Sequence, residues 1–547
     1  MKVLGVNALF HDPAAALVVD GVVVAAAEEE RFSRRKHGHR PVPFAAWELP
    51  ELAARWCLEV AGLEPEDLDA VAYSFDPGIA EPADDLGLTD PWDHLRLTYA
   101  RRAPEFLATA LPGLDPASVR FVRHHVAHAA SSALAAPAGD WDVLVLDGRG
   151  ETASHLAGHY DGAGRLETLA SQRLPHSLGL LYEDVTDHLG FLRSSDEYKV
   201  MALASYGEPR FLPEIARAVE ATGDGGFRTA RIDWGGLVKR RRPDEEWTQD
   251  HADLAASVQA RLEDVLLDLT GWLHERTGAR RLGLAGGVAL NCVANTRIFA
   301  DGPYDEVWVQ PAAGDAGTAL GAALQVSADE GVPLRPMPGA DLGRGWSDEE
   351  IEQVLRTAAV PYTRPDDIAV EAARCLAEDG IVAWFQGRSE YGPRALGHRS
   401  LLANPGRAQN LRRLNDVKGR EQFRPVAPMV RSERAAEIFD RGPLPSRYML
   451  FVHDVAEDWR DRIPAVVHVD NTARVQTVDP ADEPATARML AAFEECTGLP
   501  VVVNTSLNTA GRPMVDSPRD ALEVFGSGPV DLLALGPFAV RRSGWRP

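Results

Sequence analysis

The chain has 547 residues, of which 45% are hydrophobic and 25% charged, and its formal net charge at pH 7 is −24. Because one domain usually takes about 100–200 residues, this length predicts two or three domains around a sizeable core, and the composition excludes disordered and fibrous proteins. A surface this acidic repels nucleic acid and anionic lipid, so we expect neither as the main partner.

The cysteines are scattered and form no C-x-x-C pair, which fits a reducing compartment. The N-terminal segment MKVLGVNALFHD is interrupted by His11 and Asp12 before it could serve as a signal-peptide core. No apolar run approaches the ~18 residues that a membrane helix needs. We therefore expect a cytoplasmic protein that does not act at a membrane.

Strand patterns occur twice. Residues 3–10, 14–20 and 22–30 read as three strands, with an Asp20-Gly21 turn between the last two, and a second copy with a turn at 161–164 follows at 142–172. This self-similarity predicts a duplicated lobe that faces its twin across a cleft.

Helical spacing of apolar residues at 251–276 makes the class mixed α/β. The segment 331–346 is dense in Pro and Gly, which marks a connection, and a new helix-then-strand pattern opens near 368. We place a domain boundary near residue 360, giving domains 1–360 and 361–547.

Four side chains form a candidate metal site. His124 and His128 stand four apart on a predicted helix, where both imidazoles could ligate one ion or simply form a polar helix face. Asp147 and Asp315 stand beside glycine-rich turns, where they could meet a metal or cap the next helix. Together the four would suit iron, zinc or manganese.

Three further segments could bind a ligand, the first of them a phosphate group. The turn at Gly286 and Gly287, with Asn291 behind it, could present backbone N–H groups or be only a tight turn. The stretch 388–424 holds nine Arg or Lys against three Asp or Glu, which indicates either a pocket for a polyanionic small molecule or a solvated face. The apolar strand expected at 501–508 ends in small polar groups suited to a ligand.

Twelve specific segments follow one another along the chain: NALFHDPAAAL, EEERFSRRKH, HHVAHAAS, LDGRGE, SLGLLYEDVTDHLGF, DEYKVMALASYGEP, LAGGVALNCVAN, QPAAGDAGTALGAAL, WFQGRSEYGPRALGHRSLL, VKGREQFRPVAP, HVDNTARVQTV and NTSLN. Through these segments the chain resembles, along essentially its whole length, the O-carbamoyltransferases that tailor antibiotics and nodulation factors.

The resemblance implies an N-terminal two-lobed domain of the actin-like ATPase type, similar to threonylcarbamoyl-transferases, and a C-terminal domain similar to the YrdC fold. It also implies two reactions. Carbamoyl phosphate and ATP, with Mg²⁺, would give carbamoyl-adenylate in the second domain. The first domain would pass the carbamoyl group to a hydroxyl of a small molecule, a natural product or sugar, in antibiotic biosynthesis.

The resemblance also assigns roles to residues. His11 falls on the family's catalytic histidine, expected to act as a general base, and the metal ligands fall on His124, His128, Asp147 and Asp315, with Fe²⁺ the usual ion. In the second domain the carbamoyl phosphate and ATP ligands are Lys418, Arg424, Ser506 and Asn508, helped by Arg388, Arg394 and Arg399. Nucleotide contacts in the first domain are Gly286, Gly287 and Asn291, and weaker candidates for substrate contact are Lys36, Asp196 and Lys199.

Several alternatives stay open. A tRNA threonylcarbamoylation-type enzyme would share the folds, but the charge of −24 disfavours it. Hydrogenase-maturation relatives carry Cys-rich zinc modules that these cysteines cannot supply, and a sugar-kinase-like enzyme would not need the second domain. A non-catalytic nucleotide-binding protein is the alternative from a different class, because a fold does not prove an activity.

Overall fold

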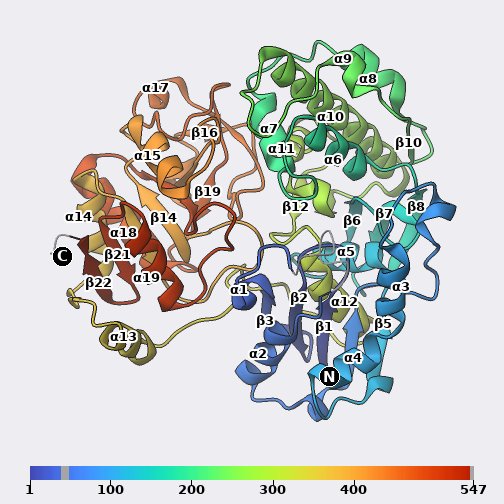
Figure 1. Ribbon diagram of the computed structural model, residues 1–547, viewed down its shortest axis with the longest axis horizontal. Helices are drawn as coiled ribbons and strands as arrows, with labels where there is room; N and C mark the ends of the chain where they lie inside the picture. The colour runs from blue at the N-terminus through green and yellow to red at the C-terminus, as the bar shows by residue number, and fades with distance from the viewer. Residues whose placement is uncertain (39–47, 543–547) are drawn as a thin grey trace. The chain divides into compact units, whose positions relative to one another are not determined.

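The computed structural model describes residues 1–38 and 48–542, and the chain divides into two compact units, Met1–Pro338 and Gly339–Pro547 (Figure 1). This division precedes the expected boundary near 360. The reason is helix α13 (Asp348–Thr357), which packs Ile351 and Leu355 into the core of the second unit.

Two mixed five-stranded sheets form the frame of the first unit, with strand orders β3-β2-β1-β4-β5 and β12-β11-β6-β7-β8. In each, a three-stranded antiparallel segment continues into two parallel strands. Their bounds are β1 (Lys2–Asn7), β2 (Ala14–Val19), β3 (Val22–Glu28), β4 (Ala70–Tyr73), β5 (Val119–Phe121), β6 (Trp141–Leu146), β7 (Ala153–Tyr160), β8 (Leu166–Arg173), β11 (Arg281–Ala285) and β12 (Glu306–Val309).

The shared order and directions confirm the duplicated, two-lobed α/β architecture expected for an actin-like ATPase domain. The predicted turn between β2 and β3 is also present: Asp20 (φ 49°) and Gly21 (φ 78°) both adopt the left-handed backbone that a two-residue hairpin turn requires.

Helices pack on and between these sheets, and a small separate pair of strands, β9 (Val219–Ala221) and β10 (Phe227–Thr229), completes the unit. The helices are α1 (Glu30–Ser33), α2 (Glu51–Ala61), α3 (Asp93–Arg101), α4 (Ala103–Ala110), α5 (His124–Ala133), α6 (Leu178–His188), α7 (Glu197–Ala204), α8 (Leu212–Ala218), α9 (Trp234–Leu237), α10 (Gln249–Thr277), α11 (Cys292–Asp301) and α12 (Ala316–Asp329). Helix α10 contains the predicted segment 251–276.

Helices α5 and α12 pack against each other between the two sheets, α12 on β1 and β2, α5 on β6 and β11. Their approach is close enough to require glycine. A Cβ atom at Gly321 of α12 would lie 1.7 Å from the carbonyl oxygen of Ala127 on α5, and one at Gly5 of β1 would lie 1.8 Å from that of Ala319. His124 and His128 lie on α5 and Asp315 directly precedes α12, so this contact brings together three of the four metal ligands predicted from the sequence.

The second unit is built on a seven-stranded mixed sheet in the order β19-β15-β20-β14-β13-β21-β22. Its strands are β13 (Val382–Phe385), β14 (Arg399–Ala403), β15 (Ala427–Arg431), β19 (Gln476–Val478), β20 (Val501–Ser506), β21 (Leu532–Leu535) and β22 (Phe538–Arg541), and a smaller sheet holds β16 (Phe439–Asp440), β17 (His453–Val455) and β18 (Thr472–Ala473). Besides α13, the helices are α14 (Ile368–Ala377), α15 (Gln409–Lys418), α16 (Ser432–Ala435), α17 (Glu457–Arg460), α18 (Pro484–Thr497) and α19 (Pro518–Ser527).

Both faces of this sheet are buried. Along β13, Val382 and Trp384 belong to a core shared with α14 and α18, whereas Ala383 and Phe385 belong to the core on the opposite face. Strands buried on two faces read as continuous apolar runs, which is the pattern the sequence has here. Among the described helices, none combines the length and the apolar sequence that crossing a bilayer would require.

Candidate functional site

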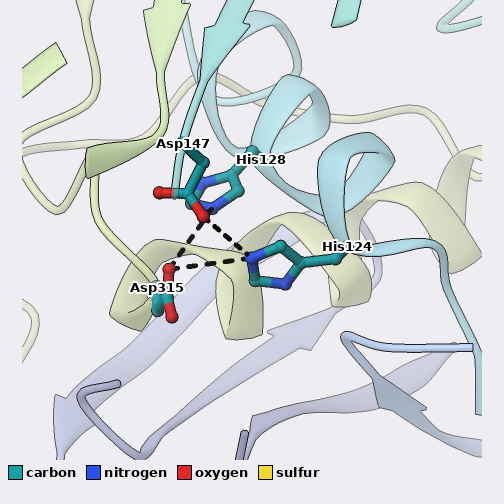
Figure 2. A group of neighbouring side chains, drawn as sticks. All are labelled: His124, His128, Asp147 and Asp315. Atoms are coloured by element: carbon teal, nitrogen blue, oxygen red, sulfur yellow. Dashed lines mark ion pairs between the residues drawn. The ribbon is translucent and has the colours of Figure 1, made fainter. Parts of the chain in front are cut away.

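Four side chains from three elements meet in the first unit (Figure 2). His124 and His128 lie one turn apart on α5, Asp147 directly follows β6, and Asp315 directly precedes α12. One ligand atom of each lies within 4.8 Å of those of the other three, and all four residues are buried. We call this group the tetrad.

Each histidine of the tetrad faces both carboxylates. Nε2 of His124 lies 3.4 Å from Oδ2 of Asp147 and 3.6 Å from Oδ1 of Asp315. For Nε2 of His128 the corresponding distances are 3.9 and 3.5 Å. The four ligand atoms therefore converge on one point without lying in ordinary hydrogen-bond contact.

The protonation of the tetrad follows from its charges. Burial alone would lower the pKa of His124, but Asp147 and Asp315 raise it well above its ordinary value. Burial would likewise raise the pKa of Asp147, but His124 and His128 hold it far below its ordinary range. The two carboxylates of the tetrad thus stabilise a positive charge at a buried position.

These features fit a bound cation. Both ring nitrogens of His128, and Nε2 of His124, are buried with no hydrogen-bond partner among the described residues. Nδ1 of His124 donates to the backbone carbonyl of Ser74 (3.2 Å), so its Nε2 lone pair is the one that faces the tetrad. Two imidazoles and two carboxylates suit iron, manganese or zinc.

The predicted glycine turn lies beside the tetrad. Gly286 has φ 90°, and a Cβ there would lie 2.1 Å from the carbonyl oxygen of Leu146, so only glycine fits. The Gly287 N–H donates to Oδ1 of Asp147 (2.9 Å), which orients that carboxylate. Asn291 caps α11 and exchanges hydrogen bonds with Gln259. In this structure all three residues thus serve the tetrad or the local fold.

His11 lies in the loop between β1 and β2, and its Nδ1 is 2.8 Å from Oδ2 of Asp12. Burial lowers the pKa of His11, but Asp12 outweighs this effect and raises it to about 10. We expected a group that titrates near neutrality. The structure instead gives an imidazole that binds its proton tightly, because a carboxylate is in direct contact with it.

The three weaker candidates lie on two neighbouring segments. Lys36 is half-buried in the turn after α1. Asp196 accepts from the Leu192 N–H (3.0 Å) and pairs with Lys199 (3.0 Å), whose ammonium also faces the ring of Phe191. These contacts are those of a local ion pair that stabilises the start of α7.

In the second unit the structure brings together three of the predicted ligands, Lys418, Ser506 and Asn508. The buried Lys418 ammonium, at the end of α15, donates to Oγ of Ser506 (3.0 Å), to Oδ1 of Asn508 (2.5 Å) and to the backbone carbonyl of Ser506. The hydroxyl of Ser506 also donates to Asn508 (2.8 Å). The result is a positive charge held by neutral oxygens at the end of β20.

The predicted arginines are arranged differently. Arg399 is fully buried and donates to the backbone carbonyls of Gln386 (2.8 Å) and Arg344 (2.9 Å). Arg388 donates to the carbonyl of Gly343 (2.9 Å). Arg424 lies 3.5 Å from Glu421, and Arg394 lies half-buried in the loop between β13 and β14. Arg388 and Arg399 therefore hold the segments 342–344 and 386–387 through backbone carbonyls.

Sequence reasoning missed several residues around His11 and the tetrad. Asp12, His37 and Ser195 form a hydrogen-bonded group with His11, and Asn7 and Ser74 connect this group to the tetrad. The dipeptide His11-Asp12 was the only local signal, because the other partners come from loops far apart in the chain.

Comparison with known proteins places these sites in a wider context. Residues 2–107 and 106–324 match the family model described as carbamoyltransferase N-terminus, and residues 373–542 match the one described as carbamoyltransferase C-terminus.

Two relatives align over nearly the whole chain. An uncharacterised protein of Synechocystis is 36% identical over 99% of this chain and 97% of its own. Nodulation protein NolNO of Sinorhizobium fredii is 38% identical over 98% of this chain and 80% of its own. Among solved structures, HypF of T. kodakarensis matches with a TM-score of 0.36 and 15% identity, over 61% of this chain and 49% of that one.

Proposed function

Since the chain belongs to the carbamoyltransferase family and is a carbamoyltransferase, we propose that it makes carbamoyl-adenylate from carbamoyl phosphate and ATP and transfers the carbamoyl group to a hydroxyl of a small-molecule natural product, in antibiotic biosynthesis. The second unit, for which the resemblance implies a YrdC-like fold, would form the adenylate. The first unit would carry out the transfer. The net charge of −24 supports a small acceptor over a nucleic acid.

In the first step water cleaves carbamoyl phosphate to carbamate and phosphate. A carbamate oxygen then bonds to the α-phosphorus of ATP, and the bond to the β-phosphate oxygen breaks to release pyrophosphate. The cleavage of carbamoyl phosphate and the attack on ATP both develop negative charge on oxygen atoms, and a preorganised ammonium group would stabilise that charge. Lys418, held by Ser506 and Asn508 in a buried place, supplies one. Arg424 is proposed to assist, and Mg²⁺ to accompany ATP.

In the second step the acceptor oxygen bonds to the carbamoyl carbon, the bond from that carbon to the phosphate oxygen breaks, and AMP leaves with the electron pair. His11 is proposed to take the proton of the hydroxyl at Nε2. The imidazolium form of His11 must first lose its Nε2 proton, and Asp12 opposes this loss because it raises the pKa of His11.

One observation carries the assignment of transfer to the first unit: the buried tetrad, in which both nitrogens of His128 lack hydrogen-bond partners among the described residues. His124, His128, Asp147 and Asp315 would hold Fe²⁺ or another divalent transition ion. When bound, such an ion supplies Lewis acidity toward the carbamoyl group.

The decisive experiment is pyrophosphate release from ATP with and without carbamoyl phosphate, in the absence of any acceptor. We expect release only when carbamoyl phosphate is present. Release that does not depend on it, or no release from metal-loaded protein, would contradict the proposed half-reaction, and calorimetry with ATP would then test the non-catalytic alternative.

A further inference from the structure

Asp12 bridges two imidazoles in the first unit. Its Oδ2 lies 2.8 Å from Nδ1 of His11, and its Oδ1 lies 2.8 Å from Nδ1 of His37. The two rings are in contact, with centroids 4.4 Å apart and planes inclined by 33°. One carboxylate therefore fixes two histidines that are far apart in sequence.

The hydrogen bonds determine where the ring protons are. An ionised carboxylate only accepts, so each Nδ1 must carry a proton. The lone pair of neutral His11 is then on Nε2, and that of neutral His37 is on its own Nε2, which lies 3.0 Å from the hydroxyl of Ser195. This is the arrangement by which a carboxylate selects the tautomer of a catalytic base.

The backbone supports a functional reading of this group. Phe10 (φ 59°), Asp12 (φ 46°), His37 (φ 61°) and Ser194 (φ 56°) all have the left-handed backbone that non-glycine residues rarely adopt. These four residues lie in the three loops that deliver His11, His37 and Ser195. Backbone strain of this kind persists only where the surrounding structure holds it, and it is concentrated at functional sites.

Neighbouring residues hold the loops that carry His11 and His37 in place. Nδ2 of Asn7 donates to the carbonyls of His11 (2.8 Å) and Asp12 (3.1 Å), and the His37 N–H donates to Glu30 (2.9 Å). Two guanidinium groups, those of Arg96 and Arg149, face the ring of Phe10. These contacts therefore hold His11, Asp12 and His37 in a defined arrangement.

We infer that Asp12 and His37 are positioning residues for carbamoyl transfer: Asp12 fixes His11 in the Nδ1–H tautomer, and His37, held by Ser195, fixes the second oxygen of Asp12. Without His37 the Asp12 carboxylate could rotate, and His11 would lose its fixed direction. The inference deepens the proposed function, because it rests on His11 as the base of the transfer step.

The test reads the ring protons directly. In protein labelled with ¹⁵N-histidine, we expect two downfield Nδ1–H resonances, assigned by the loss of one in His11→Asn and of the other in His37→Asn. Asp12→Asn should abolish both. His37→Ala should weaken the His11 resonance, whereas His37→Asn should preserve it, because the asparagine Nδ2 occupies the place of the donor. Ser195→Ala should weaken only the His37 resonance.

An unchanged His11 resonance in folded His37→Ala, or in Asp12→Asn, would overturn the inference. So would a second divalent ion per chain that is lost in His37→Ala, since the three side chains would then be metal ligands. These readouts need no acceptor, so they stand even if the proposed function fails. With a hydroxyl acceptor that the wild type carbamoylates, kcat should fall about 10- to 100-fold in His37→Ala, recover largely in His37→Asn, and leave pyrophosphate release unchanged.

Discussion

The backbone carbonyl of Ser74 accepts a hydrogen bond from Nδ1 of His124 at 3.2 Å. The hydroxyl of Ser74 in turn donates to Oδ1 of Asn7 (3.2 Å) and accepts from Thr318 (2.8 Å). Because Asn7 also holds the carbonyl of His11, one hydrogen-bond network joins the tetrad to the His11 loop. The two parts of the proposed transfer site are thus positioned together, through residues that belong to neither.

Asn7→Ala tests this connection. The substitution leaves the carbonyls of His11 and Asp12 without their donor, so we expect the free energy of unfolding to fall by about 1–3 kcal/mol and carbamoyl transfer to fall with it. Metal content should stay at the wild-type value, because no ligand is changed. Urea titration and elemental analysis measure these effects. Unaltered stability and transfer would show that the network does not hold the loop.

The tetrad predicts a single tightly held divalent ion. His128→Ala removes a ligand and should abolish binding, whereas His125→Gln, a buried neighbour on the same helix that is not among the four, should retain it. Metal at 100 times its Kd should raise the free energy of unfolding by about 2.7 kcal/mol in the wild type and not in His128→Ala. Equal metal content in the two variants would place the ion elsewhere.

Lys418→Ala should stop pyrophosphate release. In the proposed adenylation step the positive charge comes from the buried ammonium bonded to Ser506 and Asn508, and the loss of one such preorganised donor typically costs about 100- to 1000-fold in kcat. Lys239→Ala, which changes an exposed lysine of the first unit, serves as the control. Normal release in a folded Lys418→Ala protein would remove this residue from the site.

As the proposed base, His11 should set the pH dependence of transfer through its pKa. Burial lowers that pKa, but Asp12, aided by Asp315 and Glu197, raises it from 6.5 to about 10. A base must be unprotonated, so transfer should rise with pH up to about 10, and Asp12→Asn should move the rise to lower pH. Initial rates between pH 6 and 10.5, compared with pyrophosphate release in the same buffers, check this. A rate that falls over the range would make the imidazolium the active form.

The same shift affects stability, and its sign follows from the direction. A raised pKa in the folded state means that the folded protein binds the proton more tightly than the unfolded chain. The resulting stabilisation is complete below pH 6.5 and is lost as the pH rises toward about 10. Substitution of His11 by Asn should remove this part of the pH dependence of unfolding.

Local sequence patterns predicted much of the strand framework of the first unit. The Asp20-Gly21 turn and the apolar runs around it predicted β2 and β3, because both signals lie within a few residues. Helix α13 was missed although Ser347 and Glu350 form a capping box, the usual signal of a helix start. The boundary was placed near 360 because of the helix-then-strand pattern that opens near 368, whereas the division lies inside the Pro- and Gly-rich segment 331–346.

The site was predicted less evenly. Two histidines one helical turn apart are visible in the sequence, Asp147 and Asp315 stand out as carboxylates beside glycine-rich turns, and the resemblance assigned all four as metal ligands. The contacts of His37 and Ser195 could not be foreseen, because they join residues 158 positions apart through loops with no repeating pattern. The use of Arg399 for backbone carbonyls was equally hidden, since a run of positive residues does not tell which of them are buried.

The packing of α12 against α5 should also control the geometry of the tetrad, although Gly321 is not one of its ligands. A methyl group at Gly321 would meet the carbonyl of Ala127, which lies on α5 between His124 and His128, so Gly321→Ala must push α12 away from α5. Asp315 precedes α12 and would move with it. We expect a loss of roughly 1–3 kcal/mol in the free energy of unfolding, and of metal binding.

Gly271→Ala is the matched control for this last prediction. Gly271 lies inside α10, where an added Cβ would have no atom within 4 Å, so helix propensity alone should stabilise the variant by up to about 1 kcal/mol. Urea titration and metal content of both variants decide the matter. If Gly321→Ala kept wild-type metal content, the contact between α5 and α12 would not be what brings Asp315 to the two histidines.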